Sequence, residues 1–440
     1  MEADLKILYI QSTPYVDRTT LVKKSRLYFV GLAPAILAAL VPAVEFEVCL
    51  ETIEEVNFES DADLIAISGM GHAIVRSIDI AKEFKRRGKT VVMGGYMVSL
   101  MPEEAKKYCD SVVIGDGEKS FVELVKDFQS GELKPFYNMP LSSLTYPLPK
   151  YELLASKRIG NFLPIQAGRG CPNSCSFCSV FCLYRGTYLK RDIEEVIRDL
   201  ERIKELGYNQ FLLLDDNIFS DIPYLLDLCR QLKMLNMKWM SQCSIDIADN
   251  PIVLKAVAES GCFALSFGIE TISQESLNNL NKSWANVEKY QSQLAKISAA
   301  GIDLSTEMVI GADGDTLESI QKTADFIVEN KIVVPRFYIL TPIPGTLFFD
   351  EMDQQGRIIN HDIYSYNGTV AVHQPRNMTP DELTKAYWNL YRQVYSPKAI
   401  IKRTILRKDF LKKPFKYMFY MYINLFYRSR IKHGITPNII

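Results

Sequence analysis

The segment from Gly168 to Cys178 reads GRGCPNSCSFC, and it decides how the rest of this 440-residue chain is interpreted. Its cysteines, Cys171, Cys175 and Cys178, are separated by three and then by two residues. Thiolates at this spacing can hold three irons of one cubane cluster from a compact loop. Because a [4Fe–4S] cluster has four irons, three protein ligands would leave one iron open to another molecule.

Three alternatives to a cluster with an open iron remain at this point. Zinc is the rival metal, but a structural zinc site is closed by four ligands. The histidines that could complete such a site are all remote in sequence: His72, His361, His373 and His433. Cys182 is a candidate fourth ligand, and it would close the open iron. The remaining alternative is three unrelated core cysteines.

The cysteine loop follows the first of six strand-like segments, which alternate with amphipathic helical stretches such as Ile193–Leu206 and Val287–Ala300. These strands are expected at Phe162–Ala167, Gln210–Leu214, Trp239–Ser244, Phe263–Gly268, Ser305–Ile310 and Arg336–Leu340. Six βα units predict an incomplete barrel, a partial (β/α)6 fold of the TIM type. Functional groups of such barrels gather at the carboxyl ends of the strands.

The first 130 residues also alternate strand and helix, with helical stretches such as Ile74–Arg87 and Pro102–Tyr108. Strands are expected at Lys6–Gln11, Phe46–Leu50, Asp63–Ser68, Thr90–Gly94 and Ser111–Ile114. This pattern predicts a Rossmann-like parallel sheet covered on both faces. Glycines at the strand ends would admit a ligand there, or they simply form tight turns. The candidates are Gly94, Gly95, Gly115 and Gly117.

We therefore divide the chain into an α/β domain over residues 1–130, a proline-punctuated linker over 131–160, the barrel over 161–350, and a helical C-terminal extension over 351–440. The net charge is −1, which favours neither nucleic acid nor membrane. Nine cysteines spread over a long chain do not form a small disulfide framework. The start of the chain shows no secretory signal pattern, so we expect a cytoplasmic protein. The apolar stretch Gly31–Val44 is too short to cross a bilayer and is expected to be a buried helix.

CxxxCxxC after the first strand of a six-unit barrel resembles the radical S-adenosylmethionine (SAM) superfamily. The resemblance implies that the open iron binds SAM. Reduction of the cluster by an external one-electron donor, such as flavodoxin or ferredoxin, then yields methionine and a 5′-deoxyadenosyl radical.

Further residues match the family at the strand ends. The resemblance places Phe177 near the adenine, although a core aromatic is the alternative. It places Glu270 of a Gly-Ile-Glu element near the ribose, Gly311 on the adenine side, and Gln242 among the SAM-binding residues. Asp215 and Asp216 resemble a paired-aspartate element. One carboxylate is expected to bind polar groups of cofactor or substrate in a catalytic role, and the other to cap the next helix.

The domain before the barrel resembles the cobalamin-binding module of the B12-dependent radical enzymes. The matching segments are Val91–Gly95, Met101–Glu104 and Val113–Glu118. Tyr96-Met97 departs from the Pro-His-like pair of many relatives. The Asp-x-His-x-x-Gly element is absent, so cobalt would be bound without a protein imidazole. A degenerate sheet that only packs on the barrel is the alternative.

Segments beyond the barrel, including Asn377–Leu383, resemble a B12-binding group that includes hopanoid methylases. The resemblance implies an enzyme that moves a methyl group from methylcobalamin to an unactivated carbon of a small, hydrophobic or lipid-like substrate. Two molecules of SAM would be consumed per methyl group. A radical cyclase or ring-forming oxidase, and a non-enzymatic electron carrier or corrinoid sensor, are the alternatives. Tyr188–Arg191 replaces two arginines of many relatives, which leaves the expected substrate contact open.

The last forty residues combine cations with aromatic side chains. Eleven Lys or Arg and one acid lie between Lys398 and Lys432, around the aromatic run Phe415–Tyr427. Such a helix can lie in a membrane interface, at the inner face of the membrane here, with its cations near anionic headgroups. Packing on the barrel and contact with another partner are the alternatives. Nucleic acid is not expected, because one helix offers no stacking platform.

Overall fold

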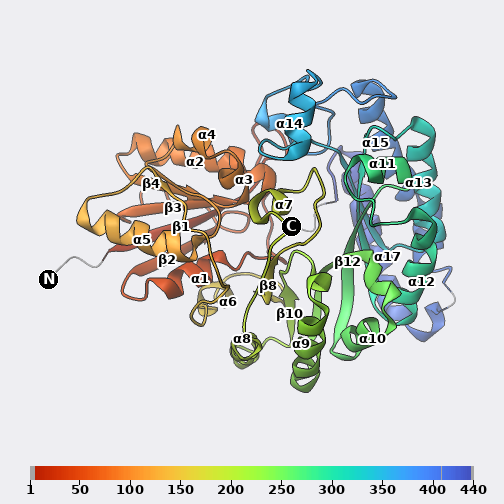
Figure 1. The fold of residues 1–440 in the computed structure, drawn as a ribbon, viewed down its shortest axis with the longest axis horizontal. Helices are drawn as coiled ribbons and strands as arrows, with labels where there is room; N and C mark the ends of the chain where they lie inside the picture. Colours follow the sequence, from red (N-terminus) through yellow and green to blue (C-terminus); the bar gives the residue numbers. More distant parts are fainter. Residues whose placement is uncertain (1–4, 408, 438–440) are drawn as a thin grey trace. The chain divides into compact units, whose positions relative to one another are not determined.

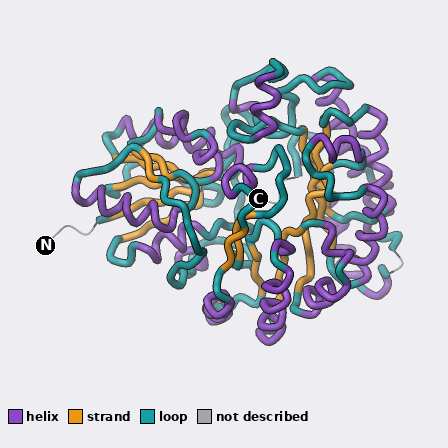
Figure 2. The backbone as a smooth tube through the Cα atoms, in the orientation of Figure 1, coloured by secondary structure: helices purple, strands orange, loops and turns teal. Residues whose placement is uncertain are grey.

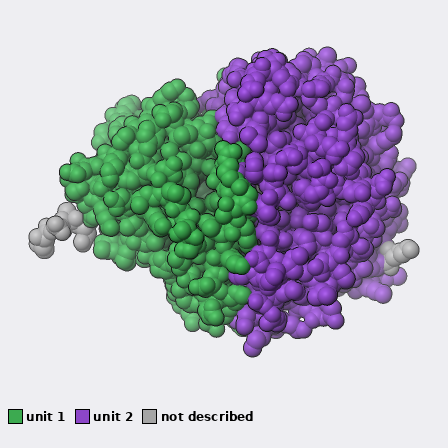
Figure 3. Space-filling view, viewed as in Figure 1, with its two compact units in different colours: residues 1–170, 182–214, 440 green, residues 171–181, 215–439 purple. Residues whose placement is uncertain are grey.

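A computed structural model describes residues 5–407 and 409–437 of the chain (Figure 1). Lys408, one of the tail cations, lies outside the described residues. The chain forms two compact units (Figure 3). The described part of unit 1 comprises residues 5–170 and 182–214, and that of unit 2 comprises 171–181, 215–407 and 409–437. This division does not coincide with the boundaries expected at residues 130, 160 and 350.

Unit 1 contains a parallel sheet of six strands in the order β2-β1-β3-β4-β5-β6. The strands are β1 (Lys6–Ser12), β2 (Glu45–Leu50), β3 (Leu64–Gly69), β4 (Thr90–Gly94), β5 (Ser111–Val113) and β6 (Phe136–Tyr137). The helices are α1 (Ala33–Leu40), α2 (Ile74–Arg86), α3 (Tyr96–Leu100), α4 (Pro102–Lys106), α5 (Gly117–Ser130) and α6 (Glu152–Ala155). Helices lie on both faces of this sheet, as Figures 1 and 2 show. The expected Rossmann-like fold is thereby confirmed.

The strand order places a topological switch point between β1 and β3, because the chain leaves β1 toward β2 and then returns to β3. Ser12 pairs with Gly69, and Ser68 pairs with Gly94, so the strand ends meet at one edge. Ligands of doubly wound sheets bind at such a point. The glycine-bearing loops therefore lie at the carboxyl ends of the strands, as the sequence predicts.

The segment 131–160, expected to be a linker, is structured. It contributes β6 to the first sheet, and it buries side chains that include Tyr146 and Tyr151. The sequence did not indicate this packing, because the segment contains several prolines and its buried residues are too widely spaced to show a helical or strand period.

The second sheet is parallel and has the order β14-β13-β12-β11-β10-β7. Its strands are β7 (Leu163–Ile165), β10 (Gln210–Leu213), β11 (Lys238–Cys243), β12 (Cys262–Glu270), β13 (Asp303–Ile310) and β14 (Val334–Ile339). A short antiparallel pair, β8 (Gly168–Gly170) with β9 (Tyr188–Lys190), was not expected. Burial alternates along β13 and β14, so one face of these strands is covered more fully than the other. The predicted strands are all present, with ends shifted by one or two residues.

Helices join and follow these strands. They are α7 (Ser179–Tyr184), α8 (Ile193–Glu205), α9 (Ile222–Leu235), α10 (Pro251–Glu259), α11 (Gln274–Asn279), α12 (Tyr290–Ala299), α13 (Leu317–Glu329), α14 (Leu347–Gln354), α15 (Pro380–Val394), α16 (Pro397–Thr404) and α17 (Pro414–Lys432). In unit 2, α10, α12 and α15 pack on β12, β13 and β14 respectively (Figure 1). Among the described helices, none is both long and apolar enough to cross a membrane. The C-terminal extension is helical, as expected.

Candidate cluster and cofactor site

The cysteine loop is held to the rest of unit 2 by its backbone. Ser176 N donates to the Leu280 carbonyl at 3.1 Å, and Phe348 N donates to the Ser176 carbonyl at 3.0 Å. Asn281 Nδ2 donates to the Ser174 carbonyl at 2.7 Å. These contacts join the loop to the segments after α11 and at α14, so its path does not depend on the cysteines alone.

The three thiols lie in a partly desolvated setting that also supplies N–H groups. Burial raises the pKa of each thiol, and it raises the pKa of Cys178 to about 12. Backbone N–H groups oppose this rise at Cys171 and Cys178. Asn217 Nδ2 also donates to Cys171 Sγ at 3.8 Å. N–H groups directed at sulfur stabilise thiolate ligands and tune cluster potentials.

This setting fits the chemistry of an iron–sulfur cluster. Buried thiols with raised pKa values become thiolates when a cation binds, and such binding releases protons. Among the described residues, however, no group of three or more His, Cys, Asp or Glu is arranged so that it could hold a metal ion. Cluster ligation by Cys171, Cys175 and Cys178 therefore remains a prediction. Cys182 lies on α7 and is partly exposed.

Glu270 ends β12 in an unusual conformation and forms a buried ion pair. Its φ of 63° lies in the left-handed region, which non-glycine residues adopt mainly where the surroundings impose it. Lys282 Nζ donates to Glu270 Oε1 at 2.6 Å and to the Gly268 carbonyl at 2.7 Å. A Cβ on Gly268 would stand 2.5 Å from Glu270 Oε1, so glycine is required beside this pair.

Lys282 also interacts with the cysteine loop. Burial lowers the pKa of Lys282, but the charge of Glu270 and the nearby Cys175 and Cys178 raise it above its ordinary value overall. The ammonium is therefore held charged in a buried position, where an anionic group of a ligand would find a partner.

Gly311 follows β13 and is tightly enclosed. Its φ is 94°, and a Cβ would stand 2.4 Å from Leu383 Cδ2. Its N–H donates to Asp315 Oδ2 at 2.9 Å, and its carbonyl contacts the buried His373 Nε2 at 3.3 Å. Burial lowers the pKa of His373 to about 4, so this imidazole stays neutral. The predicted SAM contact at Gly311 stays a prediction, and its backbone is now seen to be fixed.

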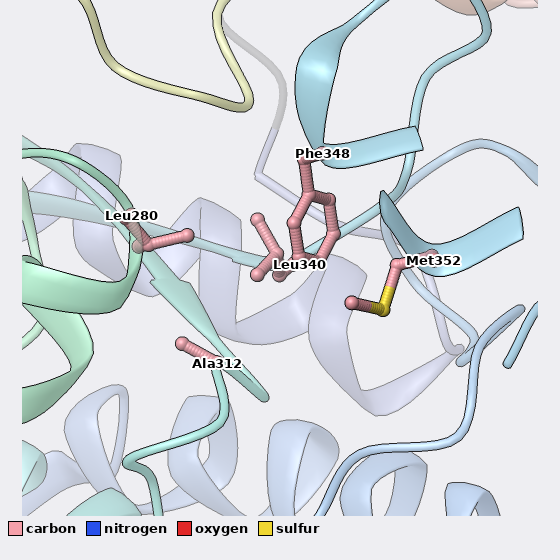
Figure 4. Packing of buried hydrophobic residues seen from close by; sticks show 5 residues of the cluster. All are labelled: Leu280, Ala312, Leu340, Phe348 and Met352. Atoms are coloured by element: carbon pink, nitrogen blue, oxygen red, sulfur yellow. The ribbon is translucent and has the colours of Figure 1, made fainter. Parts of the chain in front are cut away.

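Phe177 is partly buried and packs against a hydrophobic cluster of unit 2. Figure 4 shows the members of that cluster, which are Leu280, Ala312, Leu340, Phe348 and Met352. They come from segments that follow α11, β13 and β14 and from α14. Phe177 thus packs against the core, as the alternative interpretation expected, but it is only partly buried. Its contact with the adenine remains a prediction.

The paired aspartates behave differently from what the sequence suggested. Asp215 is buried and Asp216 is partly exposed. Neither is the helix cap: Asn217 caps the short helical turn Ile218–Ser220, and Asp221 caps α9. The capping expectation was wrong because it overlooked these two neighbours. Asp216 lies close enough to Cys171 to raise the pKa of that thiol, which keeps it near the candidate cluster loop.

Gln242 lies on β11 opposite Ser266 of β12, and its side chain is exposed. Its neighbours Ser241 and Cys243 are buried, so Gln242 points to the less covered face of the sheet. The structure thus leaves Gln242 accessible to a ligand on that face.

In unit 1, the glycines predicted to border the corrinoid differ in the space around them. Gly95 and Gly115 have φ values of 106° and 72°, and a Cβ on Gly115 would meet no atom within 4 Å. Gly115 N donates to Ser99 Oγ at 2.8 Å. Gly94 ends β4, and Gly117 begins α5. These backbone conformations favour glycine at Gly95 and Gly115, but a Cβ on Gly95 would stand 2.9 Å from Ser68 Oγ, so only Gly115 of the two borders open space.

A buried ion cluster occupies the same edge of unit 1, and sequence reasoning missed it. Arg169 donates to Asp116 Oδ1 at 2.6 Å and to Glu118 Oε1 at 2.8 Å. Tyr184 donates to Asp116 Oδ1 at 2.8 Å, and Gln166 Oε1 accepts from Arg169. Arg169 thus links the Gly115–Glu118 loop to the strand that precedes the cysteines in the chain.

Arg191, part of the segment whose substrate contact was left open, is fully buried within unit 1. It forms an ion pair with Asp199 at 2.9 Å and donates to the Gln166 carbonyl at 3.1 Å, and its guanidinium lies 4.0 Å from the Tyr146 ring centre. Its contacts are structural, and they tie the segment 131–160 to α8.

Comparison with known proteins identifies the family of the chain. Residues 165–327 match the family model of the Radical SAM superfamily, and residues 29–125 match that of the B12 binding domain. The chain is 30% identical over 353 residues to bacteriochlorophyllide d C-12(1)-methyltransferase of Chlorobaculum tepidum, covering 78% of this chain and 77% of that protein. It is 25% identical over 358 residues to hopanoid C-2 methylase of Rhodopseudomonas palustris, covering 78% and 66%.

The chain therefore belongs to the B12-binding radical SAM enzymes, in the methyltransferase family that includes the Chlorobaculum tepidum protein. The solved structure of TsrM, a radical SAM methyltransferase from Kitasatospora setae with cobalamin and a [4Fe–4S] cluster bound, shares the fold, with a TM-score of 0.65 at 17% identity over 80% of this chain and 78% of that one. The family resemblance expected from the cysteine motif is confirmed. Membership of an enzyme family also argues against the non-enzymatic alternative.

Proposed function

We propose that this chain is a cobalamin-dependent radical SAM methyltransferase that acts on an unactivated carbon of a hydrophobic or lipid-like small molecule. The observation that carries the proposal is the cysteine loop of unit 2, whose desolvated thiols receive N–H groups and interact with the buried cation of Lys282. The relatives support methyl transfer, because one methylates bacteriochlorophyllide d and another is named a hopanoid methylase.

When bound, the cluster, SAM and cobalamin would together supply an electron, a carbon radical and a methyl group. The protein's own residues have simpler tasks. Cys171, Cys175 and Cys178 would hold three irons. Lys282 would offer its ammonium to the methionine carboxylate, and Glu270 would keep that ammonium charged and oriented.

Unit 1 would hold the corrinoid at its strand ends. The open space at Gly115, which follows β5, supports this placement. His72 is partly buried and has no Asp two residues before it, so no lower cobalt ligand is assigned to it. An external one-electron donor of the flavodoxin or ferredoxin kind completes the proposed partners, in a cytoplasmic setting.

Iron binding is tested by single substitutions in the full chain. Cys171→Ala, Cys175→Ala and Cys178→Ala should each lose the cluster after anaerobic reconstitution, because two thiolates do not retain a cubane. Cys182→Ala is the matched control and should keep the wild-type iron content and visible absorbance. Loss of iron in Cys182→Ala would make it the fourth ligand and would remove the open iron on which the proposal depends.

Methyl transfer is tested by turnover of the reconstituted holoenzyme with SAM, a reductant and candidate acceptors. Bacteriochlorophyllide d and a hopanoid are the first acceptors, because relatives act on them. Methionine, 5′-deoxyadenosine and S-adenosylhomocysteine should appear in equal amounts with a methylated product. Deoxyadenosine with product but without S-adenosylhomocysteine would exclude methylation and favour the cyclase alternative.

A further inference from the structure

The exposed side of α17 is apolar from Phe415 to Phe426. Its exposed side chains recur at helical spacing and form one stripe, which we call the α17 stripe: Phe415, Met418, Phe419, Tyr422, Leu425 and Phe426. Phe415 is 85% exposed and Tyr422 is 68% exposed, and the adjacent Leu411 is 88% exposed. Large aromatic side chains so fully in water are unusual on a soluble surface when they adjoin one another.

The opposite side of α17 is already occupied. Tyr417, Asn424, Tyr427 and Ile431 are buried. Asn424 Oδ1 accepts from the buried Arg403 at 2.9 Å, and Asn424 Nδ2 donates to the Val333 carbonyl at 3.2 Å. Because Asn424 is fully buried and bonded to both, the helix is fixed on unit 2 with its apolar stripe outward. Packing on the barrel, one of the alternatives for this tail, thus accounts for one face only.

The charged residues of α17 and its flanking segments from Phe410 onward have one sign, although Asp303 pairs with Lys416 and Asp409 accepts from Tyr417. From Phe410 to the end of the chain the sequence contains no Asp or Glu. Lys412 and Lys413 precede the helix, and Arg430 and Lys432 lie in its last turn. Lys412, Lys413 and Lys432 are exposed. The surface is therefore an aromatic stripe with cations at both ends.

We propose that the α17 stripe is a docking surface for an anionic lipid bilayer, on which the helix lies parallel to the membrane plane. Aromatic side chains enter the headgroup region, and Lys residues beside them are attracted to anionic lipids. A second copy of the chain is a poorer occupant, because pairing two such stripes would bring two sets of cations together with no acid on either helix. The inference is independent of the reaction catalysed by the enzyme.

The helix cannot serve as a span, which agrees with a position in the membrane interface. Its 19 residues correspond to a length of about 28 Å, but they include polar and charged side chains throughout. Since the helix is already folded against unit 2, binding would not have to order it, and the cost in conformational entropy would be small.

The test is co-sedimentation of the reconstituted full-length holoenzyme with vesicles of phosphatidylcholine, and of phosphatidylcholine mixed with phosphatidylserine. The wild-type protein should bind the mixed vesicles, and added salt should weaken that binding. F415E/F419E/Y422E should abolish it. K412Q/K413Q/K432Q should weaken it roughly a hundredfold, since each cation near an anionic surface contributes about fivefold.

The matched control is M234E/I252E, which places acids at two apolar positions that are 81% and 71% exposed and belong to α9 and α10. It should bind vesicles like the wild type. Unfolding temperature and deoxyadenosine formation should be unchanged in every variant. The proposal is overturned if the wild type ignores phosphatidylserine, if F415E/F419E/Y422E still binds, or if sedimentation shows a wild-type dimer that this variant converts to monomer, which would assign the stripe to a second copy.

Discussion

Lys282 Nζ lies 2.6 Å from Glu270 Oε1, and the two side chains are 6% and 10% exposed. The pair joins a residue with left-handed backbone at the end of β12 to a lysine that follows α11. Cys175 and Cys178 of the cysteine loop raise the pKa of this lysine electrostatically. Twelve residues separate the partners in sequence. Through this contact, the charges at the end of β12 and in the cysteine loop influence one another.

Breaking this pair should destabilise the protein strongly. Lys282→Met leaves a buried carboxylate without its cation, and we expect a loss of roughly 3 to 5 kcal/mol in the free energy of unfolding. Lys282→Met combined with Glu270→Gln should recover most of that loss. Lys296→Met is the control, because its ion pair with Asp249 is about half exposed and should contribute less than about 1 kcal/mol. Urea unfolding measures all three, and equal losses in Lys282→Met and Lys296→Met would contradict the assignment.

Arg169 should show strong coupling to the loop that precedes α5. Arg169→Met leaves Asp116 and Glu118 buried without a guanidinium, so we expect a loss of roughly 3 to 5 kcal/mol. A double-mutant cycle with Glu118→Gln should give a coupling energy of about 1 to 3 kcal/mol. Arg86→Met, which removes an exposed pair with Glu83, is the comparison and should change little. Additive effects in the Arg169 cycle would show that the carboxylates have another source of compensation.

Acidification should weaken the fold through His373. Its pKa falls from 6.5 to about 4 on burial, so the unfolded chain binds a proton that the folded chain does not. Stability therefore decreases as the pH falls below 6.5 and levels off below about 4. Between pH 7 and pH 5 the loss from this residue should be roughly 2 kcal/mol. His373→Asn should flatten the pH dependence, whereas His361→Asn, at an exposed position, should not. Parallel profiles for His373→Asn and the wild type would refute this origin.

Gly311→Ala should be more costly than an alanine at another left-handed glycine. Its Cβ would meet Leu383 at 2.4 Å as well as adopting a strained φ, and we expect a loss of roughly 2 to 4 kcal/mol. Gly301 has a φ of 87° and no atom near its Cβ, so Gly301→Ala reports the backbone strain alone, about 1 kcal/mol. Thermal unfolding of both variants separates the two costs. Equal shifts would show that Leu383 moves aside freely.

Much of the architecture was readable in the sequence for a physical reason. Strands such as Thr90–Gly94 are short apolar runs that lie between glycines and amphipathic helices. That pattern is typical of a parallel sheet covered by helices. The strands that escaped notice are short: β6 has two residues, and β8 is Gly-Arg-Gly. They are held by pairing with distant segments, Val112 with Phe136 and Gly168 with Lys190, which no local pattern records.

The sequence by itself determined the chemistry that this chain can host. The spacing of Cys171, Cys175 and Cys178 and the glycines after β4 and β5 are local features, because backbone reach and φ depend on neighbouring residues. Only the tertiary structure decided which charges stand beside them. Two ion pairs depend on the folded chain: Lys282 with Glu270, and Arg169 with Asp116 and Glu118. Burial sets the strength of these pairs, and burial is a property of the folded chain. The folded chain likewise decides that the α17 stripe faces outward.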